Sequence, residues 1–195
     1  MEERGLKLSD EKTVITNIND GFDCLGWNFR KFKGKLLIQP SRKSKQKVTR
    51  SLSRTVKYYH EASQELLIVK LNQITRGWAE YHHCVCAKKT YALIDHRLWE
   101  MLWKWAKRRH PRKGKKWIKN RYWHPKGNRE WSFRTDKVIL YQMMDMPIVR
   151  IRSLDLKKNP FLDSEYFEHR RKRHKKDKKT AYLSSTAALS GYYAL

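Results

Sequence analysis

One stretch of the chain combines many cationic side chains with indole rings. Between Met101 and Arg129 there are twelve Lys or Arg residues and no Asp or Glu, together with four tryptophans: Trp103, Trp105, Trp117 and Trp123. Dense cations neutralise a polyanion backbone and release its counterions, and flat rings give exposed bases a surface for stacking. A solvated charged face would account for the cations but not for the tryptophans. The pattern therefore indicates contact with nucleic acid.

A second group of cations lies earlier in the chain. Ten Lys or Arg residues occur between Lys31 and His60, again without an acid. Ser41 can cap a helix that runs to about His60, whose apolar stripe has spacings of four, four and three: Val48, Leu52, Val56 and Tyr59. We expect a basic patch on the exposed side of this helix, formed by Lys43, Lys47, Arg50 and Arg54.

Two further helices and several strands position these groups. Apolar spacing predicts helices from about Gln64 to Cys84 and from about Lys88 to Arg109, and a short helix over Lys115–Tyr122. Apolar and β-branched runs between turn signals predict five strands: Thr13–Ile18, Phe22–Arg30, Leu36–Gln39, Glu130–Thr135 and Pro147–Arg152. From Glu165 onward, the charge block His169–Lys176 leads us to expect a disordered tail.

These elements predict a mainly α (α+β) protein. We expect a basic three- to four-helix bundle with a small N-terminal β appendage and a short C-terminal segment that contains strands. The predicted boundaries are 1–40 for the strands, 41–125 for the helical domain, 126–165 for the C-terminal segment and 166–195 for the basic tail.

The glycine of Arg76-Gly77-Trp78 lies inside a predicted helix, where it costs about 1 kcal/mol relative to alanine. Such a glycine indicates either close packing against a neighbouring helix or close approach of an RNA backbone, with Arg76 on a phosphate. Trp78 falls on the apolar stripe of its helix and is expected in the core.

The types of polar residue argue against chemistry on a substrate. His82, His83, Cys84 and Cys86 resemble metal ligands, but Cys84 and Cys86 would point about 200° apart on a helix and no second cluster completes a zinc site. Two-metal phosphoryl transfer needs convergent carboxylates, and the acids here are few and scattered. We therefore expect no catalytic residue, no metal and no cofactor.

The overall composition sets the class of partner. The chain has 45 Lys and Arg against 19 Asp and Glu, a formal net charge of +26, which indicates a large anionic partner. The three cysteines give no disulfide framework, and the sequence has neither a signal peptide nor a membrane-spanning run. These features predict a soluble, cytoplasmic protein.

Several motifs resemble the C-terminal half of group II intron reverse transcriptase/maturases. Gly5–Thr13 and Gly21–Trp27 are similar to the last two reverse-transcriptase blocks, with Cys24 where the family more often has an aromatic or aliphatic residue. Arg76–Tyr81, and Leu98–Pro111 followed by Lys116-Trp117-Ile118, are similar to the maturase-specific domain. The pattern continues in Pro147–Arg150, Asn159–Phe161 and Glu165–Phe167, so the likeness covers roughly residues 5–173.

The resemblance implies an RNA-binding maturase domain that stabilises folded intron RNA and assists splicing, without polymerase activity of its own. The polymerase carboxylates of the family lie upstream of every motif in this chain, and the Cys- and His-rich nuclease module is absent. The RNA-binding residues that we expect in addition to the patch on the first helix are Arg76, Lys104, Lys107, Arg108, Arg109, Arg112, Lys115, Lys116 and Trp117.

Other functions stay open at this point. A general DNA- or RNA-binding protein, a nuclease or polymerase subunit, and a non-functional truncated reverse transcriptase fragment would share much of this composition. Within the family reading, the chain could be a relic, could work beside a separate polymerase half, or could act as an independent maturase.

Overall fold

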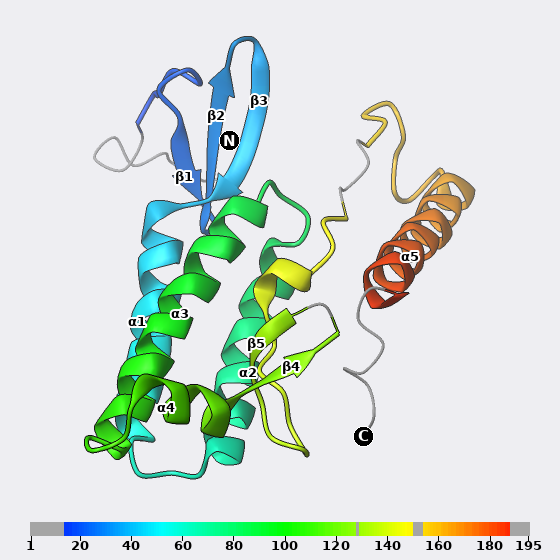
Figure 1. The fold of residues 1–195 in the computed structure, drawn as a ribbon. Helices are drawn as coiled ribbons and strands as arrows, with labels where there is room; N and C mark the ends of the chain where they lie inside the picture. The colour runs from blue at the N-terminus through cyan, green and yellow to red at the C-terminus, as the bar shows by residue number, and fades with distance from the viewer. Residues whose placement is uncertain (1–13, 128, 150–153, 188–195) are drawn as a thin grey trace.

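The computed structural model describes residues 14–127, 129–149 and 154–187. A three-stranded sheet precedes a bundle of three long helices, and a short helix with a two-stranded sheet follows. A last helix stands beside the bundle (Figure 1). The mainly α fold with small β elements is as predicted.

The N-terminal sheet is a meander of three antiparallel strands: β1 (Phe22–Cys24), β2 (Trp27–Phe32) and β3 (Lys35–Pro40). Leu25-Gly26 and Lys33-Gly34 connect them with φ angles of 49° and 80°, and of 46° and 78°. Two successive positive φ angles are the signature of tight type I′ turns. The prediction of one strand over Phe22–Arg30 is therefore wrong, because the first turn divides it.

The predicted strand Thr13–Ile18 is also wrong for its described residues. Val14–Asn17 have no regular structure, and a turn begins at Ile18, while Thr13 lies outside the described residues. Asn17 folds this segment locally, since its side-chain oxygen accepts from the Asn19 backbone at 3.0 Å and its carbonyl accepts from Asp20 and Gly21. β-branched residues favour a strand only where a partner strand is available.

Three helices form the core: α1 (Arg42–Tyr58), α2 (Gln64–His82) and α3 (Lys88–Arg109). The predicted caps are present at α1, where the Ser41 hydroxyl accepts from the Ser44 backbone at 3.1 Å. The apolar stripe predicted for α1 is buried, with Tyr59 half-buried at the end of the helix, and α3 buries Tyr91, Ile94, Leu98, Leu102 and Trp105. On α2 the buried residues include Ile68, Ala79 and His82. Tyr81 of the same helix is 49% exposed, and its ring stacks on that of Trp27 in the N-terminal sheet.

Helix α4 (Lys115–Tyr122) has the predicted bounds, and β5 (Arg129–Phe133) covers most of its predicted range. Its partner β4 (Trp123–Lys126) was not predicted, since Pro125 makes the segment resemble a loop. The strand predicted over Pro147–Arg152 is wrong for residues 147–149, and 150–152 lie outside the described residues. A 3₁₀ turn, η2 (Met143–Asp145), precedes this segment, and the Val149 backbone donates to the His83 carbonyl at the end of α2.

Helix α5 (Ser164–Ala187) replaces the disordered tail that was expected. The segment contains no Pro or Gly, and its Lys, Arg, Glu and Ala residues favour helix. Glu165 and His169 face each other one turn apart at 3.6 Å. The helix contacts the bundle through Lys178 and Tyr182, which both bind the Glu80 carboxylate of α2. The charge block is therefore helical and held at the bundle by its later turns.

None of the helices in the described ranges combines the length and the apolar character that crossing a membrane requires.

Candidate nucleic-acid interface

The exposed side of α1 carries a continuous row of cations, which we call the α1 stripe: Lys43, Lys47, Arg50 and Arg54. The four residues are spaced by four, three and four, so at 100° per residue they share one side of the helix. Val48, Leu52 and Val56 bury the opposite side. Helix α1 contains no acid, and among the described residues none of the four cations forms an ion pair. The α1 stripe therefore faces solvent as an uncompensated row of positive charge.

A second cationic group lies where α3 ends and α4 begins, and we call it the α3–α4 group. Its members are exposed: Lys104, Lys107, Arg108, Arg112, Lys115 and Lys116. Basic residues near the C-terminus of α3 also interact favourably with its helix dipole. The helix ends at His110, whose backbone donates to the Lys107 carbonyl, and Pro111 follows. The chain thus turns from one cationic helix directly into another.

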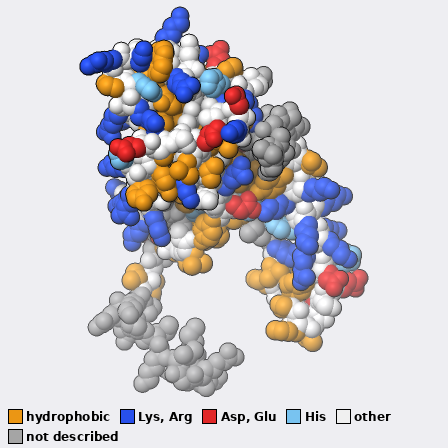
Figure 2. Space-filling view, turned by 90° about the horizontal axis from the view of Figure 1, so that it is seen from below, with side chains coloured by type: hydrophobic (Ala, Val, Ile, Leu, Met, Phe, Trp, Pro, Cys, Tyr) orange, Lys and Arg blue, Asp and Glu red, His pale blue; other side chains and the backbone are white. Residues whose placement is uncertain are grey.

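A groove lies between the carboxyl ends of α1 and α3, beside the α3–α4 group. The groove has a volume of about 470 Å³, and its walls include Lys57 and His60 on one side and Arg108 and Arg109 on the other. Glu61 is the one acid among the residues that line it. Figure 2 shows the molecule from this end, and Lys and Arg cover much of the visible surface, with few Asp or Glu. Of the predicted RNA-binding residues, Arg108 and Arg109 line the groove, whereas the α1 stripe and the predicted residues of α4 are not among its lining residues.

Arg109 has a partner inside the protein. Its guanidinium carbon lies 4.7 Å from the Trp105 ring centre, and its Nη1 donates to the carbonyls of His60 and Ala62. These contacts tie the end of α3 to the connection between α1 and α2. Arg109 therefore stabilises one wall of the groove, and its contact with RNA stays a prediction.

The tryptophans of the Met101–Arg129 stretch divide between the core and the surface. Trp105 is 3% and Trp123 1% exposed, so both belong to the core. Trp117 is 39% exposed, and the Lys113 ammonium lies 5.4 Å from its ring centre. Trp117 therefore remains available to a ligand, as predicted.

Gly77 of α2 lies in open surroundings. It is exposed, and a Cβ built at this position has no atom beyond its own helical segment within 4 Å. The interpretation that Gly77 permits close packing against a neighbouring helix is therefore wrong. Arg76 is also exposed, and its guanidinium carbon lies 5.4 Å from the centre of the Tyr141 ring. It does not line the groove, and it is not a member of the α3–α4 group. The open surface at Gly77 is compatible with the other interpretation, in which an RNA backbone approaches it.

His82 belongs to a buried polar junction between the hairpin and the bundle. Trp27 donates from Nε1 to His82 Nδ1 at 2.9 Å, which leaves the ring proton on Nε2, 3.1 Å from the Ser44 hydroxyl. Trp78 donates to the same hydroxyl at 3.2 Å. Burial lowers the pKa of His82 to about 4, so the ring is neutral at pH 7. Sequence reasoning missed this junction, because its members are far apart in the chain.

No metal site is formed by the His and Cys cluster. Within the described ranges, no three His, Cys, Asp or Glu side chains converge as ligands would. Cys84 is half-buried and Cys86 exposed, and all three cysteines are free thiols.

Two buried carboxylates are held by protein donors. Asp95 of α3 accepts from the backbones of Met143 and Met144 at 3.0 and 2.9 Å, and burial raises its pKa to about 6. Asp145 forms a two-pronged ion pair with Arg129. These acids attach η2 to α3 and β5, which gives both a structural role that the sequence did not reveal.

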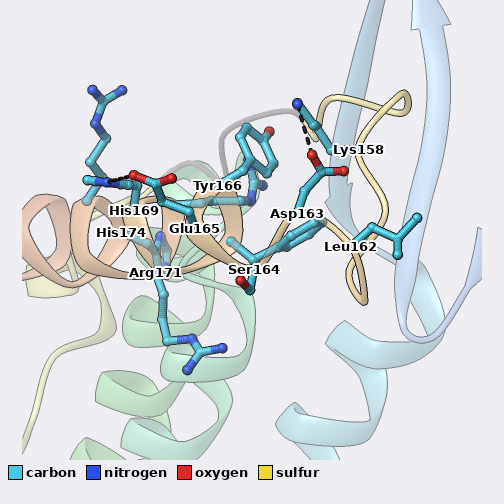
Figure 3. Close-up of a pocket in the computed structure, with 12 residues that line it drawn as sticks. Lys158, Leu162, Asp163, Ser164, Glu165, Tyr166, His169, Arg171 and His174 are labelled. Atoms are coloured by element: carbon cyan, nitrogen blue, oxygen red, sulfur yellow. Dashed lines mark hydrogen bonds and ion pairs between the residues drawn. The ribbon is translucent and has the colours of Figure 1, made fainter.

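A large hollow lies away from the predicted residues. It has a volume of about 1420 Å³ and is lined by the stretch from Lys158 to His174 (Figure 3). Lys158 pairs with Asp163 at 3.0 Å across its rim, and Glu165 pairs with His169. Because a single stretch of chain forms the walls, the hollow reflects how the approach to α5 folds back, and we assign it no ligand.

Comparison with known families connects this geometry to a function. No curated protein matches the chain. Residues 44–123, from the first turn of α1 to the start of β4, match the family model described as the group II intron, maturase-specific domain. The match contains the α1 stripe except Lys43, all of the α3–α4 group, Arg76 and Gly77. Over residues 44–123 it confirms the resemblance seen in the sequence: this part of the chain carries a group II intron maturase-specific domain.

Proposed function

We propose that the chain binds folded group II intron RNA through the α1 stripe and the α3–α4 group, and that this binding stabilises the folded RNA and assists its splicing. The observation that carries the proposal is the row of four exposed cations opposite the core of α1, which form no ion pair with the described residues and lie inside or beside the matched domain. Their regular spacing suits a phosphate backbone, because a rigid helix holds the charges at fixed intervals.

The groove between α1 and α3 supports the same proposal. It would let one RNA surface contact α1 and α3 together, with Lys57 and Arg108 on its two walls. Charge provides affinity, and the fixed shape of the two helices provides a preference for folded RNA over flexible strands. The chain contributes binding and preorganisation, and we propose that it has neither polymerase nor nuclease activity of its own.

The test measures binding of a folded group II intron RNA in competition with two other polyanions, an unstructured RNA of equal length and a duplex DNA. At physiological salt we expect the protein to keep the intron RNA bound in the presence of an excess of either competitor. Affinity should fall with salt, with a slope near 0.7–0.9 per phosphate contact. Equal competition by all three would contradict the proposal and would favour a general nucleic-acid-binding protein.

A second assay tests the proposed absence of catalysis. The purified chain is incubated with end-labelled RNA and DNA, with and without a primer and nucleotides, in Mg²⁺. We expect intact substrates and no primer extension. Cleavage or extension that copurifies with the protein would overturn this part of the proposal.

A further inference from the structure

A ladder of aromatic rings runs along α3, beside its apolar stripe. His96, Trp99 and Trp103 are spaced by three and four residues, and their rings are nearly parallel. The centroids of His96 and Trp99 are 6.3 Å apart at an interplanar angle of 11°, and those of Trp99 and Trp103 are 5.7 Å apart at 14°. Trp131 of β5 contacts both indoles, at 6.2 and 6.1 Å. We call these four residues the aromatic ladder.

The ladder passes from the core to the surface. Trp123 lies beneath it, 5.1 Å from Trp103, and is buried. Trp99 and Trp103 are half-buried, whereas Trp131 is 42% exposed and the His96 side chain 67% exposed. The buried indoles hold the ladder in place, while its outer rings remain accessible to a ligand.

Cations lie beside the accessible rings. The Lys119 ammonium is 5.3 Å from the Trp131 ring centre, and Lys107 is exposed one helical turn beyond Trp103. Glu100 faces His96 at 3.5 Å, so the far end of the ladder carries one acid. Flat rings flanked by ammonium groups match the two parts of a nucleotide, because the base stacks and the phosphate pairs with the cation.

We infer that the aromatic ladder is a stacking site for unpaired nucleobases, centred on Trp131. The inference rests on the proposed function and extends it from the phosphate backbone to single-stranded parts of the RNA. A base pair inside a helix keeps its faces covered by its neighbours, so only loops, bulges and strand ends can supply a free face. The ladder would thus select regions of the RNA that the cationic groups do not distinguish.

The direct test uses fluorine NMR of the protein labelled with 5-fluorotryptophan. Eight tryptophans give eight signals, and Trp131→Phe identifies the one from Trp131. Titration with an eight-nucleotide single-stranded RNA should shift or broaden the Trp131 signal, and titration with an eight-base-pair RNA duplex should leave it in place. A Trp131 signal that does not respond to the single strand would overturn the inference.

Substitutions test the same point by affinity. Trp131→Leu keeps an apolar side chain but removes the ring, so single-strand affinity should fall about tenfold while duplex affinity stays the same. Trp131→Phe should retain most of the single-strand affinity. Phe32→Leu is a matched control, since Phe32 is also 42% exposed and lies under a cation, Arg30, at 4.8 Å. An equal loss in the control, or no loss in Trp131→Leu, would contradict a stacking site.

A third variant guards against an effect of misfolding. Lys119→Gln leaves the indoles in place, and it should lower the affinity for single-stranded RNA by a few-fold. The proposed function fails separately from this inference. Loss of the preference for intron RNA would contradict that proposal, whereas intact intron binding with a silent Trp131 signal would contradict the stacking site alone.

Discussion

Polar side chains on the two sides of α1 have opposite environments. Toward α2, the Ser44 hydroxyl lies in a junction where Trp27, Trp78 and His82 find partners inside the protein. Toward solvent, the neighbouring Lys43 begins a row of cations without an ion pair among the described residues. Buried polar groups stabilise a fold only when they are paired, whereas like charges along one helix face repel each other. If the proposed function holds, stability and binding reside in different residues of one helix.

Reversing the charge of the α1 stripe should give the largest effect. The triple change Lys47→Glu, Arg50→Glu and Arg54→Glu is expected to lower RNA affinity by about 10³-fold at low salt and to reduce the salt slope by two or more. The unfolding midpoint should not fall, because the substituted side chains are exposed and the change lowers the large positive net charge of the protein. Filter binding over a salt series and denaturant unfolding measure the two quantities.

The control carries the same change in net charge at exposed sites outside α1: Lys33→Glu, Lys35→Glu and Lys137→Glu. It should lose much less affinity than the stripe variant. Comparable losses would show that total charge, and not the stripe, determines binding, and the contrast between the two sides of α1 would disappear.

His82→Phe should show the opposite profile. The substitution removes the acceptor of Trp27 Nε1 and one partner of Ser44, so the free energy of unfolding should fall by about 3 kcal/mol. Intron RNA affinity, measured where the variant is folded, should stay within about twofold. A stable variant, or a folded variant with strongly reduced affinity, would show that the junction and the stripe are not separable.

Acid should weaken the same junction. The pKa of His82 is depressed in the folded protein, to about 4 from an ordinary value of 6.5, so its contribution is present above pH 6.5 and is lost as the pH falls toward 4. Loss of this contribution should lower the free energy of unfolding by about 2 kcal/mol between pH 7 and pH 4.5. The raised pKa of Asp95, about 6, acts in the opposite sense, because its protonation on acidification favours the folded state.

Comparison with His82→Phe separates the two titrations. Unfolding free energies of both proteins are measured from pH 7 to pH 4.5, and the gap between them should close as the pH falls. Parallel curves would mean that His82 does not titrate in this range.

Gly77→Ala should have the smallest effect. Alanine favours helix by about 1 kcal/mol, and the added methyl group meets open space, so the variant should be more stable by up to that amount. Gln73→Ala, on the same exposed side of α2, should change the unfolding midpoint by less. If an RNA backbone approaches this surface, Gly77→Leu should lower the affinity for intron RNA. A destabilised Gly77→Ala would restore the packing interpretation.

The sequence allowed prediction of the features that depend on local periodicity. The bounds of α3 and α4, the Ser41 cap and the α1 stripe all follow from spacing along one helix. Sequence reasoning failed where partners come from distant segments. Trp123 is buried because β5 and α3 cover it, and His82 is buried because the hairpin supplies Trp27.

The aromatic ladder was missed for a similar reason. The spacing of His96, Trp99 and Trp103 could have been read from the sequence as a second row on α3, but Trp131 joins it only through the fold of β5. Helix α5 shows a different error. Charge density favours disorder only where local helix propensity is weak, and this segment has no residue that breaks a helix.

The position of Ser44 next to Lys43 has a mechanical consequence. Trp27 of the hairpin donates to His82, and the His82 ring also contacts Ser44 in the first turn of α1, where the row of cations starts; Tyr81 adds a bond from α2 to the Leu25 carbonyl at 2.6 Å. The hairpin and the proposed RNA-binding surface are therefore linked within a single helical turn, through side chains that are hydrogen-bonded to one another.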